Sequence, residues 1–236
     1  MTGGPQWAGR RVVVAGIGVS GFAAADALVE RGAQVVVADE RSGRVERERE
    51  AVLTTLGAQV RLGEGATAAL PDVDGAAPEL VITSPGWRPD QPLLAAAAAA
   101  AVPIWGEVEL AWRMRPPTGA APWLTLTGTN GKTTTGKLRT EMLTAAGRRA
   151  VAAGNVGTPL LEAVLHPHPY DVIAVELSSF QLHWSHSLRP LASACLNVAP
   201  DHVDWHGSYE EYLRAKGRVY QNTERACVYN VADPAT

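Results

Sequence analysis

Residues Thr127-Gly-Thr-Asn-Gly-Lys-Thr-Thr134 decide the fold of the second half of this chain. They follow an apolar run at 123–127 and precede a helical pattern at 133–146, which predicts a loop between a strand and a helix. The backbone N–H groups of a glycine-rich loop in that position can cradle phosphate groups. Its lysine would neutralise the terminal phosphates, and the Thr133 hydroxyl would meet Mg²⁺.

The loop departs from the general phosphate-loop pattern at one position. A strict GxxxxGK[ST] pattern needs glycine at position 126, where this chain has Leu126. The Gly-Lys-Thr core is intact, so the departure weakens a generic assignment without removing the hypothesis. The alternative is a helix cap without a ligand. The candidate phosphate-binding residues are Gly128, Thr129, Asn130, Gly131, Lys132, Thr133 and Thr134.

Short apolar runs alternate with helical patterns on both sides of this loop. Strands are expected at 11–15, 34–39, 58–62, 80–83, 123–127, 149–153, 171–176, 192–197 and 226–229. Helices are expected at 21–31, 45–56, 133–146 and 208–220, and in the alanine run, where Pro103 would end the helix. This alternation predicts parallel sheets with right-handed crossovers.

A second glycine-rich turn lies near the N-terminus. Gly16-Ile-Gly18-Val-Ser-Gly21 joins a strand to a helix, and Asp39 closes the next strand. This is the geometry of a dinucleotide or nucleotide-sugar site, because the glycines allow a tight turn and the helix N-terminus attracts a diphosphate. The alternative is a turn that only packs a helix on a strand.

The two turns belong to two predicted domains. Residues 115–122 carry three prolines and one glycine, and they are the expected linker. We therefore expect an α/β protein with a Rossmann-like parallel-sheet domain at 1–115, a linker at 116–122 and a phosphate-loop α/β domain at 123–236. Only seven residues follow the last predicted strand, so the second domain is expected to be cut in mid-fold.

The composition excludes several classes of protein. The chain has 21 Lys plus Arg residues and 24 Asp plus Glu residues. It therefore lacks the surplus of basic residues that would indicate nucleic-acid binding. The hydrophobic share of 46% is typical of a globular chain. Cys195 and Cys227 lie outside any CxxC pattern, which argues for a reducing compartment. The apolar run Leu93 to Val102 is too short to span a bilayer. A cytoplasmic protein that binds neither membrane nor nucleic acid is expected.

Further polar residues follow predicted strands of the second domain. Glu176 ends one strand, and Asp201-His-Val-Asp204 follows another, so both should reach the sheet edge where ligands bind. Beside a phosphate loop, a magnesium role for Glu176 is favoured over a solvated carboxylate or a helix cap. His202 could ligate a metal, orient a phosphate or be a hydrogen-bonded loop histidine. Lys216, on a predicted helix, is interpreted from the residues alone as a solvated lysine.

Together these motifs resemble those of the Mur ligases, ATP-dependent amide-bond-forming enzymes of peptidoglycan synthesis. The resemblance spans nearly the whole chain in the family's order. It favours the branch that adds D-glutamate to UDP-N-acetylmuramoyl-L-alanine, because alanine-adding relatives carry histidine in place of Asn130 and other branches lack a GxGxSG start. The motifs that carry it are 16–21, Ser84-Pro-Gly86, 127–134, Gly154-Asn-Val-Gly157, Glu176-Leu-Ser-Ser-Phe-Gln-Leu182, Asn197 to Asp204 and Ala215-Lys-Gly-Arg-Val-Tyr220.

The resemblance implies roles for single residues. The catalytic set would be Lys132, Glu176, His202 and Lys216. One Mg²⁺ would lie on Thr133 and Glu176, and a second on His202 and Lys216, which is carbamylated in this family and so offers the oxygen ligand that Mg²⁺ prefers. The residues that would bind the UDP-sugar substrate are Val19, Ser20, Asp39, Arg41, Ser84, Gly86, Asn155 and Ser178.

The implied reaction starts with attack of the alanine carboxylate on the γ-phosphate of ATP. The amine of D-glutamate would trap the resulting acyl phosphate as an amide, with ADP and phosphate released. The family has a third, C-terminal domain that closes over ATP and holds D-glutamate, so this chain is expected to bind the UDP-sugar, to bind ATP weakly and not to turn over. A monomer is expected. Two other interpretations stay open: a nicotinamide-dependent oxidoreductase, in which Asp39 binds a ribose hydroxyl, and a non-catalytic nucleotide-binding module.

Overall fold

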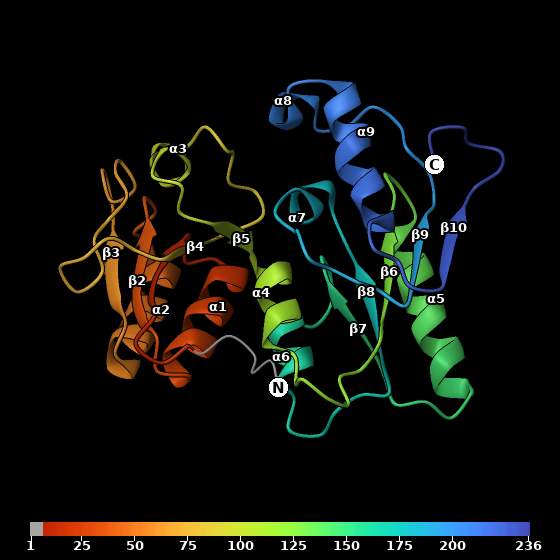
Figure 1. Ribbon diagram of the computed structural model, residues 1–236, viewed down its shortest axis with the longest axis horizontal. Helices are drawn as coiled ribbons and strands as arrows, with labels where there is room; N and C mark the ends of the chain where they lie inside the picture. The colour runs from red at the N-terminus through yellow and green to blue at the C-terminus, as the bar shows by residue number, and fades with distance from the viewer. Residues whose placement is uncertain (1–6) are drawn as a thin grey trace. The chain divides into compact units, whose positions relative to one another are not determined.

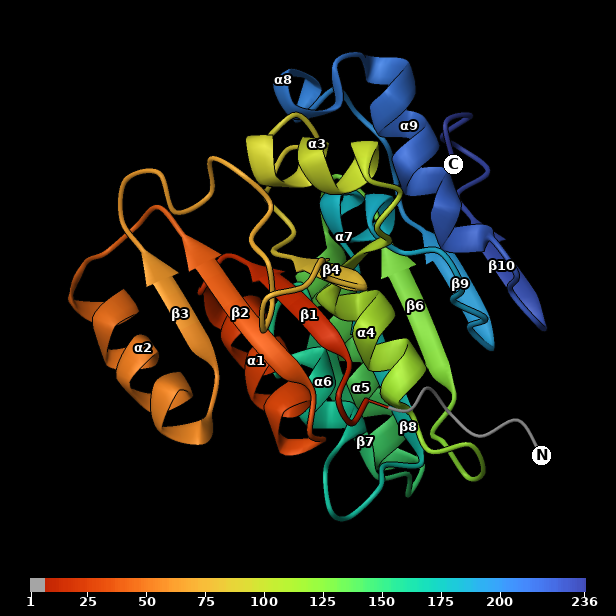
Figure 2. The same ribbon diagram turned by 60° about the vertical axis from the view of Figure 1, so that its left-hand side comes forward.

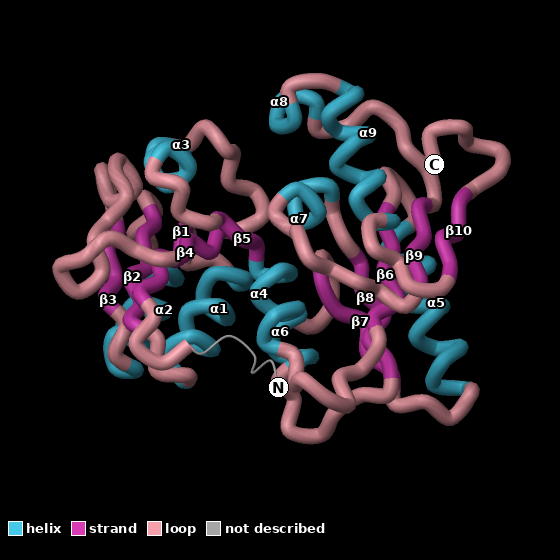
Figure 3. Tube along the Cα trace, viewed as in Figure 1, coloured by secondary structure: helices cyan, strands magenta, loops and turns pink. Residues whose placement is uncertain are grey.

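The computed structural model describes residues 7–236, which form two compact units divided between Arg113 and Met114. Each unit is built on a five-stranded parallel sheet, whose strands are drawn as arrows in Figure 1 and are labelled and coloured magenta in Figure 3. The predicted α/β class with parallel sheets is therefore confirmed. Within residues 7–236, no helix is both long enough and apolar enough to cross a membrane.

The sheet of the first unit has the strand order β3-β2-β1-β4-β5 (Figure 2). The valine-rich strands β1, β2 and β4 are buried over nearly their whole length, as is typical of parallel strands covered on both faces. Its elements are β1 (Arg11–Ala15), α1 (Val19–Glu30), β2 (Gln34–Asp39), α2 (Arg44–Leu56), β3 (Gln59–Leu62), β4 (Leu80–Thr83), α3 (Pro92–Ala99), β5 (Ile104–Gly106) and α4 (Glu107–Met114).

The register of this sheet aligns the carboxyl ends of β1, β2 and β4. Ala15 pairs with Ala38 of β2 and with Thr83 of β4. The turn that starts at Gly16, the side chain of Asp39 and the loop after β4 therefore lie together at the carboxyl edge. The strand order reverses between β1 and β4, and open α/β sheets bind ligands at such a point.

The sheet of the second unit has the order β10-β9-β6-β8-β7, with β6 at its centre. Helix α5 packs against β7 and β8, whereas the η1 segment packs against β9. The elements are β6 (Trp123–Thr127), α5 (Lys132–Ala145), β7 (Ala150–Gly154), α6 (Leu160–Val164), β8 (Val172–Glu176), α7 (Ser179–His183), β9 (Ala192–Cys195), α8 (Val203–His206), α9 (Tyr209–Gly217), the 3₁₀ helix η1 (Arg218–Tyr220) and β10 (Ala226–Tyr229).

The register of the second sheet aligns the ends of four strands. Glu176, the last residue of β8, pairs with Leu126 of β6 and with Gly154 of β7. Thr127, the last residue of β6, pairs with Cys195 of β9. The phosphate loop and the segments after β7, β8 and β9 therefore all begin at one edge of the sheet.

The structure corrects several predicted boundaries. The alanine-run helix ends at Ala99, before Pro103, because Ala101 takes a left-handed φ of 54° and Val102 N–H donates to the carbonyl of Ala97. The predicted strand 192–197 stops at Cys195, since the backbone beyond it bonds to the phosphate loop. The predicted helix 208–220 is divided into α9 and η1. Short elements such as α7 were not predicted.

Two glycines of the second unit test this packing as a matched pair. A methyl group on Gly154 would lie 2.3 Å from the carbonyl oxygen of Glu176, whereas one on Gly136 would meet no atom within 4 Å. Gly154→Ala should destabilise the unit by about 2 kcal/mol or more. Gly136→Ala, inside α5, should stabilise it by about 0.5–1 kcal/mol. Urea unfolding followed by circular dichroism measures both changes, and effects of the same sign would contradict the structure.

Candidate functional site

The loop after β6 has the backbone geometry of an anion-binding turn. Gly131 has a φ of 79°, a left-handed conformation that glycine adopts without strain. Helix α5 begins at the next residue, Lys132, and no acidic side chain lies in its first turn. The N–H groups of that turn have no partner within the helix, so they can donate to an anion at its positive end.

Asn197, in the segment after β9, forms hydrogen bonds with this loop. The N–H of Asn130 donates to Asn197 Oδ1 at 2.9 Å, and Asn197 Nδ2 donates to the carbonyl of Asn130 at 3.0 Å. The N–H of Thr129 donates to the backbone carbonyl of Asn197 at 2.9 Å. The N–H groups of Thr129 and Asn130 are thus committed to the protein, which leaves those of the first turn of α5 for a ligand.

Helix α9 holds the same loop with two buried side chains that lie one turn apart. The hydroxyls of Tyr212 and Thr129 are 2.9 Å apart, and Lys216 Nζ donates to the carbonyl of Gly128 at 2.8 Å. Burial, with a smaller contribution from the charge of Lys132, lowers the pKa of Lys216 to about 8. The interpretation of Lys216 as a solvated lysine is therefore wrong, because α9 turns that side chain toward the loop.

Two ammonium groups consequently lie at one loop. Lys132 Nζ donates to the carbonyl of Thr129 at 3.1 Å, and Lys216 is close enough for the charge of Lys132 to lower its pKa. Repulsion between two partly buried cations is relieved when an anion lies between or beside them. The donor set of this loop therefore fits a phosphate group.

Glu176 lies opposite the start of α5. Thr133 Oγ1 donates to Glu176 Oε2 at 3.1 Å, and Asn155 Nδ2 donates to Oε1 at 3.1 Å. The carboxylate is only 5% exposed, and both of these donors are neutral. A buried carboxylate gains from a neighbouring cation, and a hydroxyl and a carboxylate are the hard oxygen ligands that Mg²⁺ prefers. Thr133 and Glu176 therefore fit a magnesium ion.

Arg139 of α5 was not predicted from the sequence. Its Nε and Nη2 atoms are buried without a hydrogen-bond partner. Burial lowers the pKa of Arg139 to about 10, and the charge of Glu176 opposes this shift. An arginine on a helix is usually solvated, so the residue pattern alone carried no signal for a buried guanidinium near Glu176.

His202 contacts Asp201 and the ring of Phe180. Its side chain is 48% exposed, its Nε2 is 3.4 Å from Asp201 Oδ2, and its ring packs 4.7 Å from that of Phe180. Among residues 7–236, no three His, Cys, Asp or Glu side chains converge as a metal-binding group. A role for His202 beside Lys216 at a second ion stays a prediction.

Ser178, two residues after Glu176, is the N-cap of the short helix α7. Its Oγ accepts the N–H of Gln181 at 3.1 Å, and Gln181 Oε1 accepts the N–H of Ser178 at 2.9 Å. This reciprocal cap stabilises a helix of only five residues, because it satisfies two otherwise unpaired donors. The hydroxyl of Ser178 is used within the protein, and its substrate role stays a prediction.

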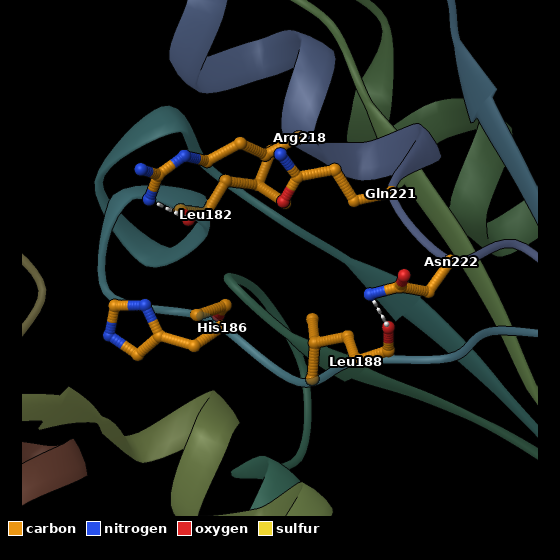
Figure 4. Close-up of a pocket in the computed structure, with 7 residues that line it drawn as sticks. Leu182, His186, Leu188, Arg218, Gln221 and Asn222 are labelled. Atoms are coloured by element: carbon orange, nitrogen blue, oxygen red, sulfur yellow. Dashed lines mark hydrogen bonds between the residues drawn. The ribbon is translucent and has the colours of Figure 1, made fainter.

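The other end of α7 is held by Arg218 of η1. Its Nη1 donates to the carbonyls of Leu182 and His183 at 3.4 and 2.6 Å, and Figure 4 shows the first of these bonds. Asn222 donates to the carbonyl of Leu188 across the same small pocket. The cavity there measures about 10 Å³, enough for about one water molecule. Its residues position α7 and leave no room for a substrate.

Aromatic rings surround two half-buried histidines, His183 at the end of α7 and His206 at the end of α8. His206 Nε2 lies 3.0 Å from Ser179 Oγ, and its ring stacks on Phe180 at 5.6 Å between centroids. The ring of His183 meets the edge of Trp205 at 5.1 Å. Burial lowers the pKa of both histidines to about 4, so both are neutral near pH 7.

In the first unit, Asp39 is bonded entirely within the protein. Its Oδ2 accepts the N–H of Ile17 at 2.9 Å and Arg41 Nη2 at 2.8 Å, and its Oδ1 accepts the N–H and Nε of Arg41 at 2.9 and 3.2 Å. Burial alone would raise the pKa of Asp39, but these hydrogen bonds outweigh it and hold the pKa below its ordinary value. A carboxylate offers about four acceptor positions, and all are filled here.

The glycine turn of the first unit is closely packed. A Cβ on Gly21 would lie 1.9 Å from the carbonyl oxygen of Gly16, and one on Gly16 would lie 2.5 Å from Ser84 Oγ. Ser84 Oγ is buried without a hydrogen-bond partner, so it is a candidate donor to a ligand at this turn. Val19 and Ser20 open helix α1 beside it, and Gly86 follows in the loop after β4.

Comparisons with known proteins identify both units. The N-terminal-domain model described as Mur ligase MurD-like matches residues 10–106, and the Mur ligase middle-domain model matches residues 126–236. The UDP-N-acetylmuramoylalanine–D-glutamate ligase of Streptomyces avermitilis is 56% identical over 98% of this chain and 48% of the relative. The protein of the same name from Thermobifida fusca is 55% identical over 96% and 47%.

The chain therefore spans about half the length of the curated relatives it matches. Solved structures agree in fold. The UDP-N-acetylmuramate–alanine ligase of Thermotoga maritima matches with a TM-score of 0.53 at 23% identity, over 96% of this chain and 50% of that chain. A UDP-N-acetylmuramate:L-alanyl-γ-D-glutamyl-meso-diaminopimelate ligase from Neisseria meningitides matches with a TM-score of 0.59 at 17% identity, over 97% and 73%.

The two half-buried histidines predict acid sensitivity of the second unit. The folded chain keeps His183 and His206 neutral down to about pH 4, whereas the unfolded chain protonates them near pH 6.5. The unfolded state then binds more protons, so the free energy of unfolding should fall as the pH drops from about 6.5 to about 4. Urea unfolding at pH 7.5 and 4.5 measures the fall.

His206→Gln should reduce that pH-dependent loss, because glutamine can still bond to Ser179 and does not titrate. The exposed residue His168 provides the control, and His168→Gln should leave the loss unchanged. A loss in His206→Gln as large as in the unmodified chain would contradict this assignment.

Proposed function

Because the chain belongs to the Mur ligase family, of which it carries the N-terminal and middle domains, we propose that the whole protein is the ATP-dependent ligase that adds D-glutamate to UDP-N-acetylmuramoyl-L-alanine. The observation that carries the proposal is the meeting of Lys132, Thr133 and Glu176 at one sheet edge, where Thr133 donates to the buried Glu176 at 3.1 Å. The names of relatives more than 50% identical support the same substrate.

The phosphate loop would bind ATP. The first-turn N–H groups of α5 would donate to the β- and γ-phosphates, and Lys132 would leave the carbonyl of Thr129 to pair with them. Thr133 and Glu176 would hold Mg²⁺, which offsets negative charge on the phosphate oxygens. Support for this comes from the neutral donors around Glu176 and from the two cations at the loop.

The reaction then needs mainly positioning and charge stabilisation. A carboxylate oxygen of the substrate's alanine forms a bond to the γ-phosphorus of ATP as the bond to ADP breaks. The amine of D-glutamate attacks the acyl phosphate carbon, loses a proton and forms the amide as phosphate leaves. Lys132 stabilises the charge that spreads over the transferred group. Asn155, which donates to Glu176, and Ser178, two residues after Glu176, would orient the substrate's alanyl end.

We also propose that Lys216 reacts with CO₂ and, with His202, holds a second magnesium ion. This reaction needs the neutral amine, and a pKa of about 8 leaves a useful neutral fraction near pH 7.5. A carbamate would replace one of the two repelling cations by an oxygen ligand suited to Mg²⁺.

The first unit would bind the UDP-sugar at its glycine turn, through Val19, Ser20, Arg41, Ser84 and Gly86, with Asp39 behind them. The filled acceptor positions of Asp39 disfavour the nicotinamide alternative, since a ribose hydroxyl would have to displace one of the chain's own donors. The non-catalytic module leaves Glu176 and Lys216 without a role. A cytoplasmic location and a monomeric state stay predictions from the sequence.

Calorimetric titration of this 236-residue chain tests the proposal. UDP-N-acetylmuramoyl-L-alanine should bind more tightly than UDP-N-acetylmuramic acid, which lacks the alanine. Lys132→Ala should weaken Mg·ATP binding about tenfold or more, because a charge-assisted contact is lost, and should leave the affinity for the UDP-sugar unchanged. Binding of NADH in place of the UDP-sugar, or of ATP alone, would contradict the proposal. A chain of the relatives' full length should release phosphate only when D-glutamate is present.

A further inference from the structure

Arg49 of α2 bonds to the glycine turn of the first unit, 32 residues earlier in the chain. Its Nη1 donates to the carbonyl of Ile17 at 2.9 Å. Two other arginines of this helix bond within it: Arg44 pairs with Glu48 at 2.7 Å, and Arg47 pairs with Glu50 at 3.7 Å. Arg49 is half-buried, so its guanidinium has given up part of its hydration for this contact.

Both backbone polar groups of Ile17, in this turn, are therefore hydrogen-bonded to side chains. The N–H of Ile17 donates to Asp39 Oδ2 at 2.9 Å, while its carbonyl accepts from Arg49. A trans peptide plane directs its C=O and N–H in opposite directions. With the carbonyl of Ile17 turned toward Arg49, the N–H of Gly18 in the same peptide plane points away from Arg49.

Gly18 is also the N-cap of α1, a helix of twelve residues with no acidic side chain in its first turn. Ser84 Oγ is buried at this turn without a partner, and Asp39 has no acceptor position left. The backbone N–H groups of the first turn can therefore donate to a ligand, as can the Ser84 hydroxyl, whereas Asp39 has no acceptor position left. This set suits a phosphate, which accepts hydrogen bonds.

We propose that Arg49 is a positioning residue for the diphosphate of the nucleotide-sugar, acting through the carbonyl of Ile17 to aim the N–H of Gly18 at a phosphate oxygen. This inference rests on the proposed function, because it assigns a determinant to the same UDP-sugar site. It gives Asp39 the complementary task of fixing the N–H of Ile17 and the side chain of Arg41.

The test compares UDP with uridine as calorimetric probes of the whole 236-residue chain. Arg49→Ala should weaken UDP binding about tenfold, as expected for the loss of one hydrogen bond and the order it imposes, and should change uridine binding less than about twofold. Arg49→Lys keeps one donor for Ile17 and should recover most of the UDP affinity. Arg47→Ala, on the same helix, is the matched control and should leave both affinities unchanged.

The amide resonance of Gly18 supplies a second readout. At saturating UDP it should shift strongly in the unmodified chain and should shift much less with Arg49→Ala. Equal weakening of UDP and uridine would assign Arg49 a merely structural role, and UDP affinity as high as that of Arg47→Ala would assign it none; either result overturns the inference. Failure of the unmodified chain to bind UDP would overturn the nucleotide-sugar site itself, and the inference with it.

Discussion

The reciprocal bonds between Asn130 and Asn197 are the contact on which the second unit's site depends. They join the phosphate loop to the segment after β9, 67 residues away, and they use the N–H of Asn130, which would otherwise be open to a ligand. Tyr212 and Lys216 of α9 also form hydrogen bonds with the loop. The loop is thereby built before any nucleotide binds, so that binding energy is not spent on ordering it.

This preformed site contains charged side chains that are buried or lie near a like charge. Lys216 and Glu176 are buried, Arg139 has two buried nitrogens without partners, and Lys132 lies near Lys216. Each such group lowers the stability of the ligand-free chain, because buried charge is costly until it is paired. Phosphate would supply a partner for Lys132, and magnesium would supply one for Glu176; neither pairs with Arg139. The ligand-free protein is then less stable than it could be, and the ligand binds more tightly because it pairs these charges. Functional sites commonly lower stability in this way.

How far the sequence predicts this structure depends on the range of the contacts. Strands 11–15, 34–39, 80–83 and 123–127 have the predicted bounds, because each is an apolar run bounded by polar or turn residues. The placement of Thr133 near Glu176 follows from the shared edge of parallel strands. The burial of Lys216 and of the Arg139 nitrogens could not be predicted in this way, because only tertiary packing decides whether a charged side chain on a helix is buried. The five-residue α7 exists because of its cap and Arg218, which no periodic pattern reveals.

Amide hydrogen exchange of the phosphate loop tests the central claim, that the protein's own contacts build the loop. Without nucleotide, the amides of Thr129 and Asn130 should already exchange slowly, because both donate to Asn197. Those of Lys132 and Thr133 should exchange fast and become slow when Mg·ATP is added. Fast exchange at Thr129 and Asn130 until Mg·ATP is added would contradict the account, because the nucleotide would then be what orders the loop.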